Sequence, residues 1–134
     1  MKELLRLVGV VTGALLFAAG AVFGLHDRQT FVPPPEAVVE SFAREVVQRR
    51  YDLAMNYLAR DLRASMGADR LRARFEPMRQ RVGTPNQVTG EPEWMQESAA
   101  SARARVEGDS GSEVLEFRLT REQGLWRIAE FPAP

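Results

Sequence analysis

The chain has 134 residues, with 18 basic side chains against 18 acidic ones, one histidine and no cysteine. The lack of cysteine excludes disulfides and thiolate metal sites. The balanced charge argues against a nucleic-acid-binding protein, because such proteins carry a strong basic excess.

The first predicted element is a membrane helix within residues 1–25. Residues 7–25 carry no charge, and residues 4–25 suffice to cross a bilayer, because a spanning helix needs about 20 apolar residues. The alternative is a cleaved signal peptide with an A-x-A-like cleavage site at residues 19–21. Because the apolar run continues beyond that site, the sequence favours an uncleaved signal anchor.

Four glycines of this segment fall on one helical face. Their spacings of 4, 7 and 4 residues place them within an arc of about 60°. Small residues let a second membrane helix approach closely, so the stripe predicts association with a protein partner or a second copy. Glycine is also simply common in membrane helices, which leaves the alternative of no specific role. The glycines are Gly9, Gly13, Gly20 and Gly24.

The charges flanking the apolar segment predict its orientation. Lys2 and Arg6 precede it and only Arg28 follows closely, so the positive-inside rule predicts a single-pass protein of the cell membrane with its C-terminal domain outside the cytoplasm. Residues 26–35 form a Pro-rich tether of at most about 30 Å. The tether would keep the domain of residues 36–134 close to the bilayer.

Residues 36–82 have the periodicity of helices. Apolar residues recur in two i, i+4 rows over residues 38–47, which predicts one wide buried face. Asp52 is expected to cap a second helix, and a third is expected to begin near Asp69. Pro77 lies inside the third pattern and should kink or end that helix.

After residue 82 the hydrophobic period changes from helical to alternating, which is typical of half-buried strands. Helices followed by an antiparallel meander predict an α+β domain whose helices cover one face of the sheet. A proline inside the first strand predicts an edge position or a bulge there. We expect strands over residues 87–96, 100–107 and 114–119 and around residues 126–128, with turns at residues 108–111 and 122–124.

Two segments resemble a known family. PPPEAVVESFAREVVQRRYDLAMNYL, residues 33–58, resembles the opening helices of nuclear transport factor 2-like (NTF2-like) domains, and GLWRIAEF, residues 124–131, resembles their last strand. The resemblance covers residues 34–134. It implies a curved antiparallel sheet of about four strands wrapped around about three helices, with a conical cavity between them. Membrane-anchored bacterial members are often envelope proteins, and the bitopic inner-membrane component of type IV secretion systems has a similar layout.

The resemblance also implies where an active site would lie. Enzymes of this superfamily, such as SnoaL-like cyclases, steroid isomerases and scytalone-type dehydratases, place Asp, His or Tyr inside the cone for proton transfer. The only histidine, His26, lies in the tether. Asp52 beside Tyr51 leaves an Asp/Tyr site open, although a helix cap accounts for Asp52. We therefore predict no catalytic residue, no cofactor and no metal site.

The alanines at positions 100, 102 and 104 of the expected inward sheet face have two interpretations. They either let the helices approach closely or leave a void. In the second case the void would be a pocket for a small apolar ligand. Its walls would be Phe42, Tyr57, Phe75, Trp94 and Trp126.

Two charged surfaces are also predicted. The third expected helix carries the densest basic run, which is either a solvated face or a contact with anionic lipid headgroups; it comprises Arg70, Arg72, Arg74, Arg79 and Arg81. The outer sheet face is expected to mix both signs of charge, which suits solvent or a polar partner; it comprises Arg103, Arg105, Arg118, Arg127, Glu107 and Glu116.

Taken together, the sequence predicts a membrane-anchored, non-catalytic binding or assembly module of the cell envelope. It would act through a protein partner, as a homo-oligomer, or on a small apolar ligand. Two alternatives stay open: an isomerase or dehydratase of the SnoaL-like kind, and a secreted soluble binding protein released by signal cleavage.

Overall fold

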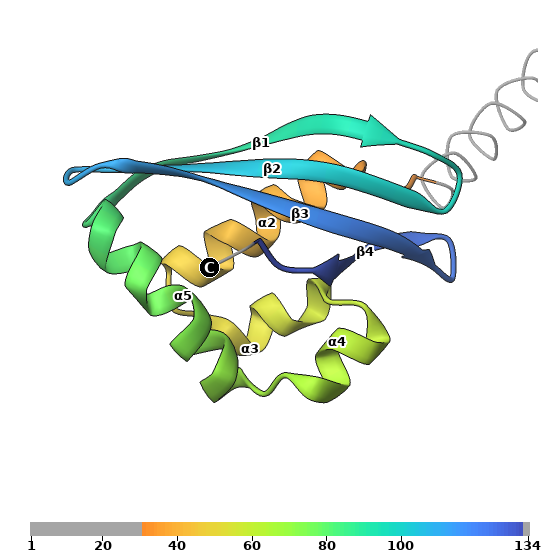
Figure 1. Cartoon of the computed structure of the whole chain (residues 1–134), viewed down its shortest axis with the longest axis horizontal. Helices are drawn as coiled ribbons and strands as arrows, with labels where there is room; N and C mark the ends of the chain where they lie inside the picture. Colours follow the sequence, from red (N-terminus) through yellow and green to blue (C-terminus); the bar gives the residue numbers. More distant parts are fainter. Residues whose placement is uncertain (1–30, 133–134) are drawn as a thin grey trace, which may run out of the picture. The chain divides into compact units, whose positions relative to one another are not determined.

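The computed structural model describes residues 31–132. Helices precede strands along the chain, which confirms the α+β prediction (Figure 1). The elements are α2 (Pro35–Val47), α3 (Tyr51–Ala54), the 3-10 turn η1 (Met55–Tyr57), α4 (Arg60–Ser65), α5 (Ala68–Val82), β1 (Pro85–Met95), β2 (Ala99–Gly108), β3 (Ser112–Glu122) and β4 (Leu125–Glu130).

The predicted membrane helix and its glycine stripe lie outside the described residues. Within residues 31–132, every helix is too short or too polar to cross a membrane.

The four strands form one antiparallel sheet in the order β1-β2-β3-β4, so each strand pairs with its neighbour in sequence. Alternate residues of β2 face the helices and are fully buried: Ala100, Ala102, Ala104 and Val106. The β3–β4 hairpin closes through Gln123 and Gly124, both with positive φ, as a two-residue primed turn requires. The meander is therefore confirmed.

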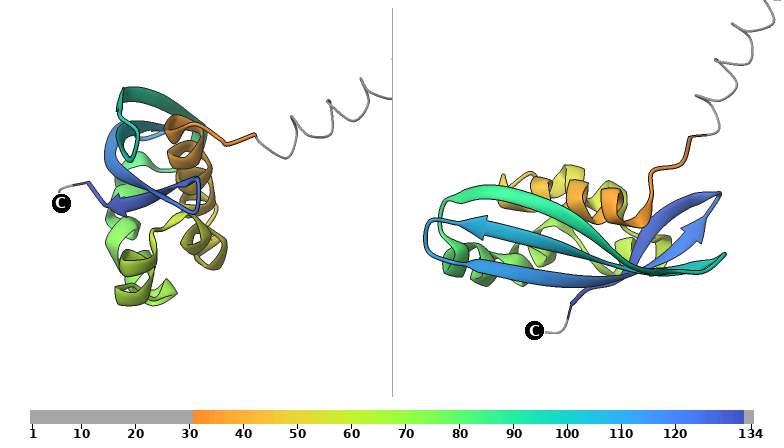
Figure 2. Two further views of the ribbon diagram at one scale, coloured as in Figure 1. Left: turned by 90° about the vertical axis from the view of Figure 1, so that its right-hand side faces the viewer. Right: turned by 90° about the horizontal axis from the view of Figure 1, so that it is seen from above.

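The helices all lie on one face of the curved sheet, as Figures 1 and 2 show from three directions. Helix α2 packs against β1 and β2, and its approach to the sheet is very close. A Cβ added at Gly90 would lie 2.0 Å from the carbonyl oxygen of Glu36. At this small residue of β1, the backbone of α2 therefore lies directly against the strand.

The second predicted helix is shorter than expected, and the domain has four α-helices rather than three. Asp52 does not cap it: the N-cap is Arg50, which makes no side-chain cap hydrogen bond, and Asp52 is the second residue of α3. The helix tightens into η1 and ends, because Leu58 forms a parallel bridge with Ile128 and the Ala59 N–H donates to the Ile128 carbonyl at 2.7 Å. This contact with β4 takes the chain out of the helix.

Pro77 does not end α5, which continues to Val82. Proline costs about 3 kcal/mol inside a helix, and each large apolar side chain gains about 1.5–3 kcal/mol on burial. Four such side chains of α5 are buried: Leu71, Phe75, Met78 and Val82. Because Pro77 itself lies on the exposed face, the burial of the opposite face outweighs the lost hydrogen bond.

Candidate functional site

The interior between the helices and the sheet contains a cluster of phenylalanine rings. The Phe42 ring lies 5.5 Å from those of Phe75 and Phe117 in edge-to-face geometry, and 5.8 Å from the Phe131 ring in a stacked arrangement. Phe42, Phe75 and Phe117 are buried almost completely. Aromatic rings at these separations fill space and attract one another, so this part of the interior is packed.

Phe131 reaches this cluster from the C-terminal end of the sheet. Its ring also lies 5.2 Å from that of Phe75, and the guanidinium of Arg74 donates a hydrogen bond to the carbonyl of Pro132. The tail after β4 therefore turns toward α2 and α5. The sequence offered one signal of this turn: a phenylalanine directly before Pro132, which cannot donate to a strand ladder.

The structure places the five residues predicted to wall a pocket in different surroundings. Phe42 and Phe75 are in contact, and Trp126 is buried with the Arg121 guanidinium 5.0 Å above its ring. Tyr57 is half-buried in η1. Trp94 is 45% exposed, because a bulge between Pro92 and Trp94 places it opposite Ser101, on the outer face.

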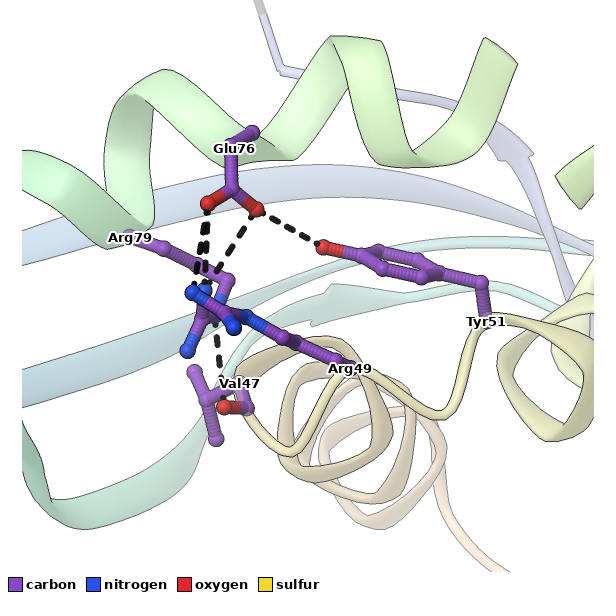
Figure 3. A network of polar contacts seen from close by, with 5 residues as sticks. All are labelled: Val47, Arg49, Tyr51, Glu76 and Arg79. Carbon is purple, nitrogen blue, oxygen red and sulfur yellow. Dashed lines mark hydrogen bonds and ion pairs between the residues drawn. The ribbon is translucent and has the colours of Figure 1, made fainter. Parts of the chain in front are cut away.

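A polar network joins the end of α2 to the middle of α5 (Figure 3). The Tyr51 hydroxyl donates to Glu76 Oε2 at 3.4 Å, and Arg79 donates from its Nη1 to both oxygens of the same carboxylate at 3.3 and 3.4 Å. Arg79 also donates from Nε to the Val47 carbonyl at 3.3 Å. The Arg49 guanidinium lies 3.5 Å from Glu76 Oε1. Glu76 thus binds three side chains at once.

The electrostatics of this network favour a structural role, in which it holds the helices together, over a role in proton transfer. Burial raises the pKa of the Tyr51 hydroxyl above its ordinary value, and the negative charge of Glu76 raises that pKa further. The phenol therefore keeps its proton at neutral pH and acts as a hydrogen-bond donor. Arg79 satisfies the α2 carbonyl that the helix end leaves free, so the network locks α2 against α5.

Two clefts border the network, and Arg49 contributes to both. The first has a volume of about 510 Å³ and includes Tyr51, Asp52, Asp69 and Arg72 in its lining. The second, of about 450 Å³, includes Glu76 and Arg79. Both clefts are lined mainly by polar and charged residues, which suits contact with a polar partner surface rather than with an apolar ligand.

The basic run of α5 is largely engaged within the domain. Arg79 and Arg74 make the contacts described above, and Arg81 pairs with Glu113. The Arg72 guanidinium lies 5.6 Å above the Tyr51 ring, and Arg70 donates to the Ser65 carbonyl. Arg74 and Arg79 are partly buried, whereas the side chains of Arg70, Arg72 and Arg81 remain exposed to solvent.

The outer sheet face mixes charges as predicted, and several of its arginines are paired with glutamates across strands. Arg105 Nε lies 3.1 Å from Glu91 Oε1, and Arg103 lies within 3.6 Å of both Glu91 and Glu93. The Ser101 hydroxyl donates to Glu93. In residues 31–132, no three His, Cys, Asp or Glu side chains group as metal ligands would.

Comparisons with known proteins bear on the fold. No protein-family model and no curated protein matches the chain. A candidate NTF2-like transpeptidase from Campylobacter jejuni superposes with a TM-score of 0.58 at 15% identity, over 73% of this chain and 99% of that protein. A SEC-C motif containing protein from Rhodopseudomonas palustris superposes with a TM-score of 0.56 at 18% identity, over 75% of this chain and 78% of that protein. The domain of the described residues therefore has an NTF2-like fold.

Proposed function

We propose that the chain is a non-catalytic binding and assembly module of the cell envelope, anchored by a membrane helix at residues 4–25 and acting through a protein partner. One observation supports the proposal that this module is not an enzyme. The phenylalanine cluster occupies the interior of the domain, where enzymes of this fold hold their substrates, so the surface is left for recognition. Phe131, supplied by the tail, lies among these rings.

The polar network supports the same proposal. Tyr51 and Glu76 are an acid and a base candidate that border the clefts, and their hydrogen bond ties α3 to α5 while Arg79 ties the end of α2 to α5. A general base needs a free lone pair within reach of a substrate proton. The two arginines beside Glu76 already take up its carboxylate.

We propose no transpeptidase activity for this chain, although the Campylobacter neighbour is named as an NTF2-like transpeptidase. At 15% identity the likeness concerns the fold, and an activity depends on the residues of a site rather than on the fold that carries it.

The test is purification of the full-length chain in mild detergent, with identification by mass spectrometry of the proteins that accompany it. We expect an intact chain of 15.0 kDa with a stoichiometric protein partner. Recovery of the intact chain alone, as a monomer, would contradict the assembly role. A mature mass lacking the first 21 residues would replace the anchored module with a secreted one.

The same purification tests the membrane helix. Replacing Gly13 and Gly20 together by isoleucine places bulk on the glycine stripe, which prevents close helix approach. We expect association through the membrane segment to weaken. Replacing Val10 and Phe17 by isoleucine is the matched control, because these changes keep the glycines.

A further inference from the structure

Strand β4 pairs with only half of β3. Its partners run from Arg118 to Glu122, whereas β3 begins at Ser112. Figure 1 shows β4 along the right-hand part of β3 alone. The chain leaves the sheet at this point because Phe131 turns into the phenylalanine cluster and Pro132 follows. Residues 112–117 of β3 consequently have β2 on one side and no strand on the other.

The register of β3 against β2 identifies the backbone groups that face this open edge. The Arg121 N–H donates to the Ser98 carbonyl and the Gly111 carbonyl accepts from Gly108, so odd-numbered residues of β3 face β2. Successive residues of a strand point their backbone groups to opposite sides. The N–H and C=O groups of Val114 and Glu116 therefore point outward, and within residues 31–132 no backbone partner beyond β2 reaches them.

The other two edges of the sheet each have outward backbone groups that are engaged or absent. On β1, the outward N–H of Gly90 donates to Glu40 at 3.1 Å, and position 92 is a proline without an N–H. On β4, Leu58 and Ala59 bind Ile128. Exposed edges are usually blocked in this way because they pair with other chains. The half-edge of β3 has no such contact among the described residues.

A groove runs beside this half-edge, between β3 and α5. Its volume is about 480 Å³, and its walls are largely apolar, with Ala73, Pro77 and Met78 on α5 and Val114 and Leu115 on β3. The Arg81–Glu113 ion pair and the Arg74–Pro132 hydrogen bond also border it. An added strand would therefore find hydrogen-bond partners along its backbone and apolar contact on one of its faces.

The charge near this edge indicates which side chains an added strand would carry on its outer face. Glu116 is exposed on the outer sheet face, and it forms no ion pair with any described residue. A basic side chain directly across from it would be favoured. A second copy of the same edge would instead bring Glu113 and Glu116 of both chains close together, so like charges oppose self-pairing.

We propose that residues 112–117 bind an extended segment of a protein partner, which adds to the sheet beside β3 with small apolar side chains in the groove and basic side chains over Glu116. This mode is strand addition, in which backbone hydrogen bonds give affinity and alternate side chains give specificity. The proposal rests on the partner-binding function above and names the surface that performs it.

The test uses the full-length protein, labelled with ¹⁵N and held in neutral detergent micelles. The probe is the capped peptide Lys-Val-Lys-Val-Lys-Val, and Glu-Val-Glu-Val-Glu-Val is its charge-reversed control. We expect the largest amide shifts and new protection from hydrogen exchange at Val114 and Glu116, with the lysine peptide binding roughly tenfold more tightly. Equal binding of both peptides, or shifts centred on the β1 edge, would overturn the proposal.

Substitutions complete the test. Glu116→Lys should reverse the peptide preference, whereas Glu97→Lys, an equal charge change on an exposed residue of the β1–β2 turn, should leave it unaltered. Val114→Pro removes one outward N–H and should abolish binding; if it does not fold, the Glu116→Lys result still decides. Concentration-dependent protection of Val114 without peptide would assign the edge to self-association instead. If both variants still co-purify with the partner, the edge proposal fails while the binding function stands.

Discussion

The carboxylate of Glu40 accepts a hydrogen bond from the Gly90 N–H at 3.1 Å, so a side chain of α2 engages an outward backbone donor of β1. The contact is possible because Gly90 has no side chain, which allows the first turn of α2 to lie directly against the strand. Gly90 thus has two roles: its lack of a side chain lets α2 pack closely, and its N–H donates the hydrogen bond that Glu40 accepts. The hydrogen bond and the close packing can be tested separately.

Glu40→Ala should destabilise the domain and open the β1 edge. Loss of the partner leaves the Gly90 N–H unsatisfied, which costs about 1–3 kcal/mol, and an open edge promotes association. Urea unfolding and light scattering measure the two effects. Glu40→Gln is the matched control, since it keeps an acceptor oxygen while losing the ion pair with Arg44. Equal behaviour of the two variants would show that the hydrogen bond is unimportant.

Gly90→Ala should be among the more damaging single-methyl additions in the domain. The new Cβ would lie 2.0 Å from the Glu36 carbonyl oxygen, so α2 must move away from β1, at a cost of about 3 kcal/mol. The control is Gly111→Ala, where the nearest atom is 3.5 Å from the added Cβ. A Gly90→Ala variant as stable as the Gly111→Ala variant would contradict the packing described.

Much of the sheet could be predicted from the sequence because its signals are local. Alternation in β2 and β3 follows from one buried face, and Gly124 marks the hairpin. The end of the second helix could not be predicted, because it depends on Leu58 meeting Ile128, 70 positions away in sequence. Helical periodicity carries no information about such a partner.

The candidate pocket shows a second reason for the limits of prediction. Helical spacing predicts buried positions for Phe42 and Phe75, and both side chains are buried. No comparable periodic signal marks Trp94, which is exposed. The bulge after Pro92 shifts the register by one residue and turns Trp94 to the outer face. The polar network could not be predicted because its members come from separate helices, and only the packing of α5 against α3 brings Glu76 to Tyr51.

Stability should fall in alkaline solution partly through Tyr51. Its pKa is raised in the folded state by burial and by Glu76, while the unfolded chain releases the proton near pH 10. Its stabilising effect is therefore complete below about pH 10 and is lost as pH rises through the folded-state value. Urea unfolding from pH 8 to pH 11 should show a steeper loss for the native protein than for Tyr51→Phe. Parallel curves would remove Tyr51 as the source.

Phe131→Ala tests whether the tail keeps the interior closed. The ring contacts Phe42 and Phe75 and is half-buried, so its removal should cost about 2 kcal/mol, less than for a fully buried phenylalanine. The vacated space borders apolar rings, and an apolar dye such as anilinonaphthalene sulfonate should bind the variant and not the native protein. Phe131→Leu retains most of the volume and should cost less than about 1.5 kcal/mol without dye binding. Comparable dye binding by the native protein would mean that the interior is already accessible, and it would favour the small-ligand alternative over a partner bound at the surface.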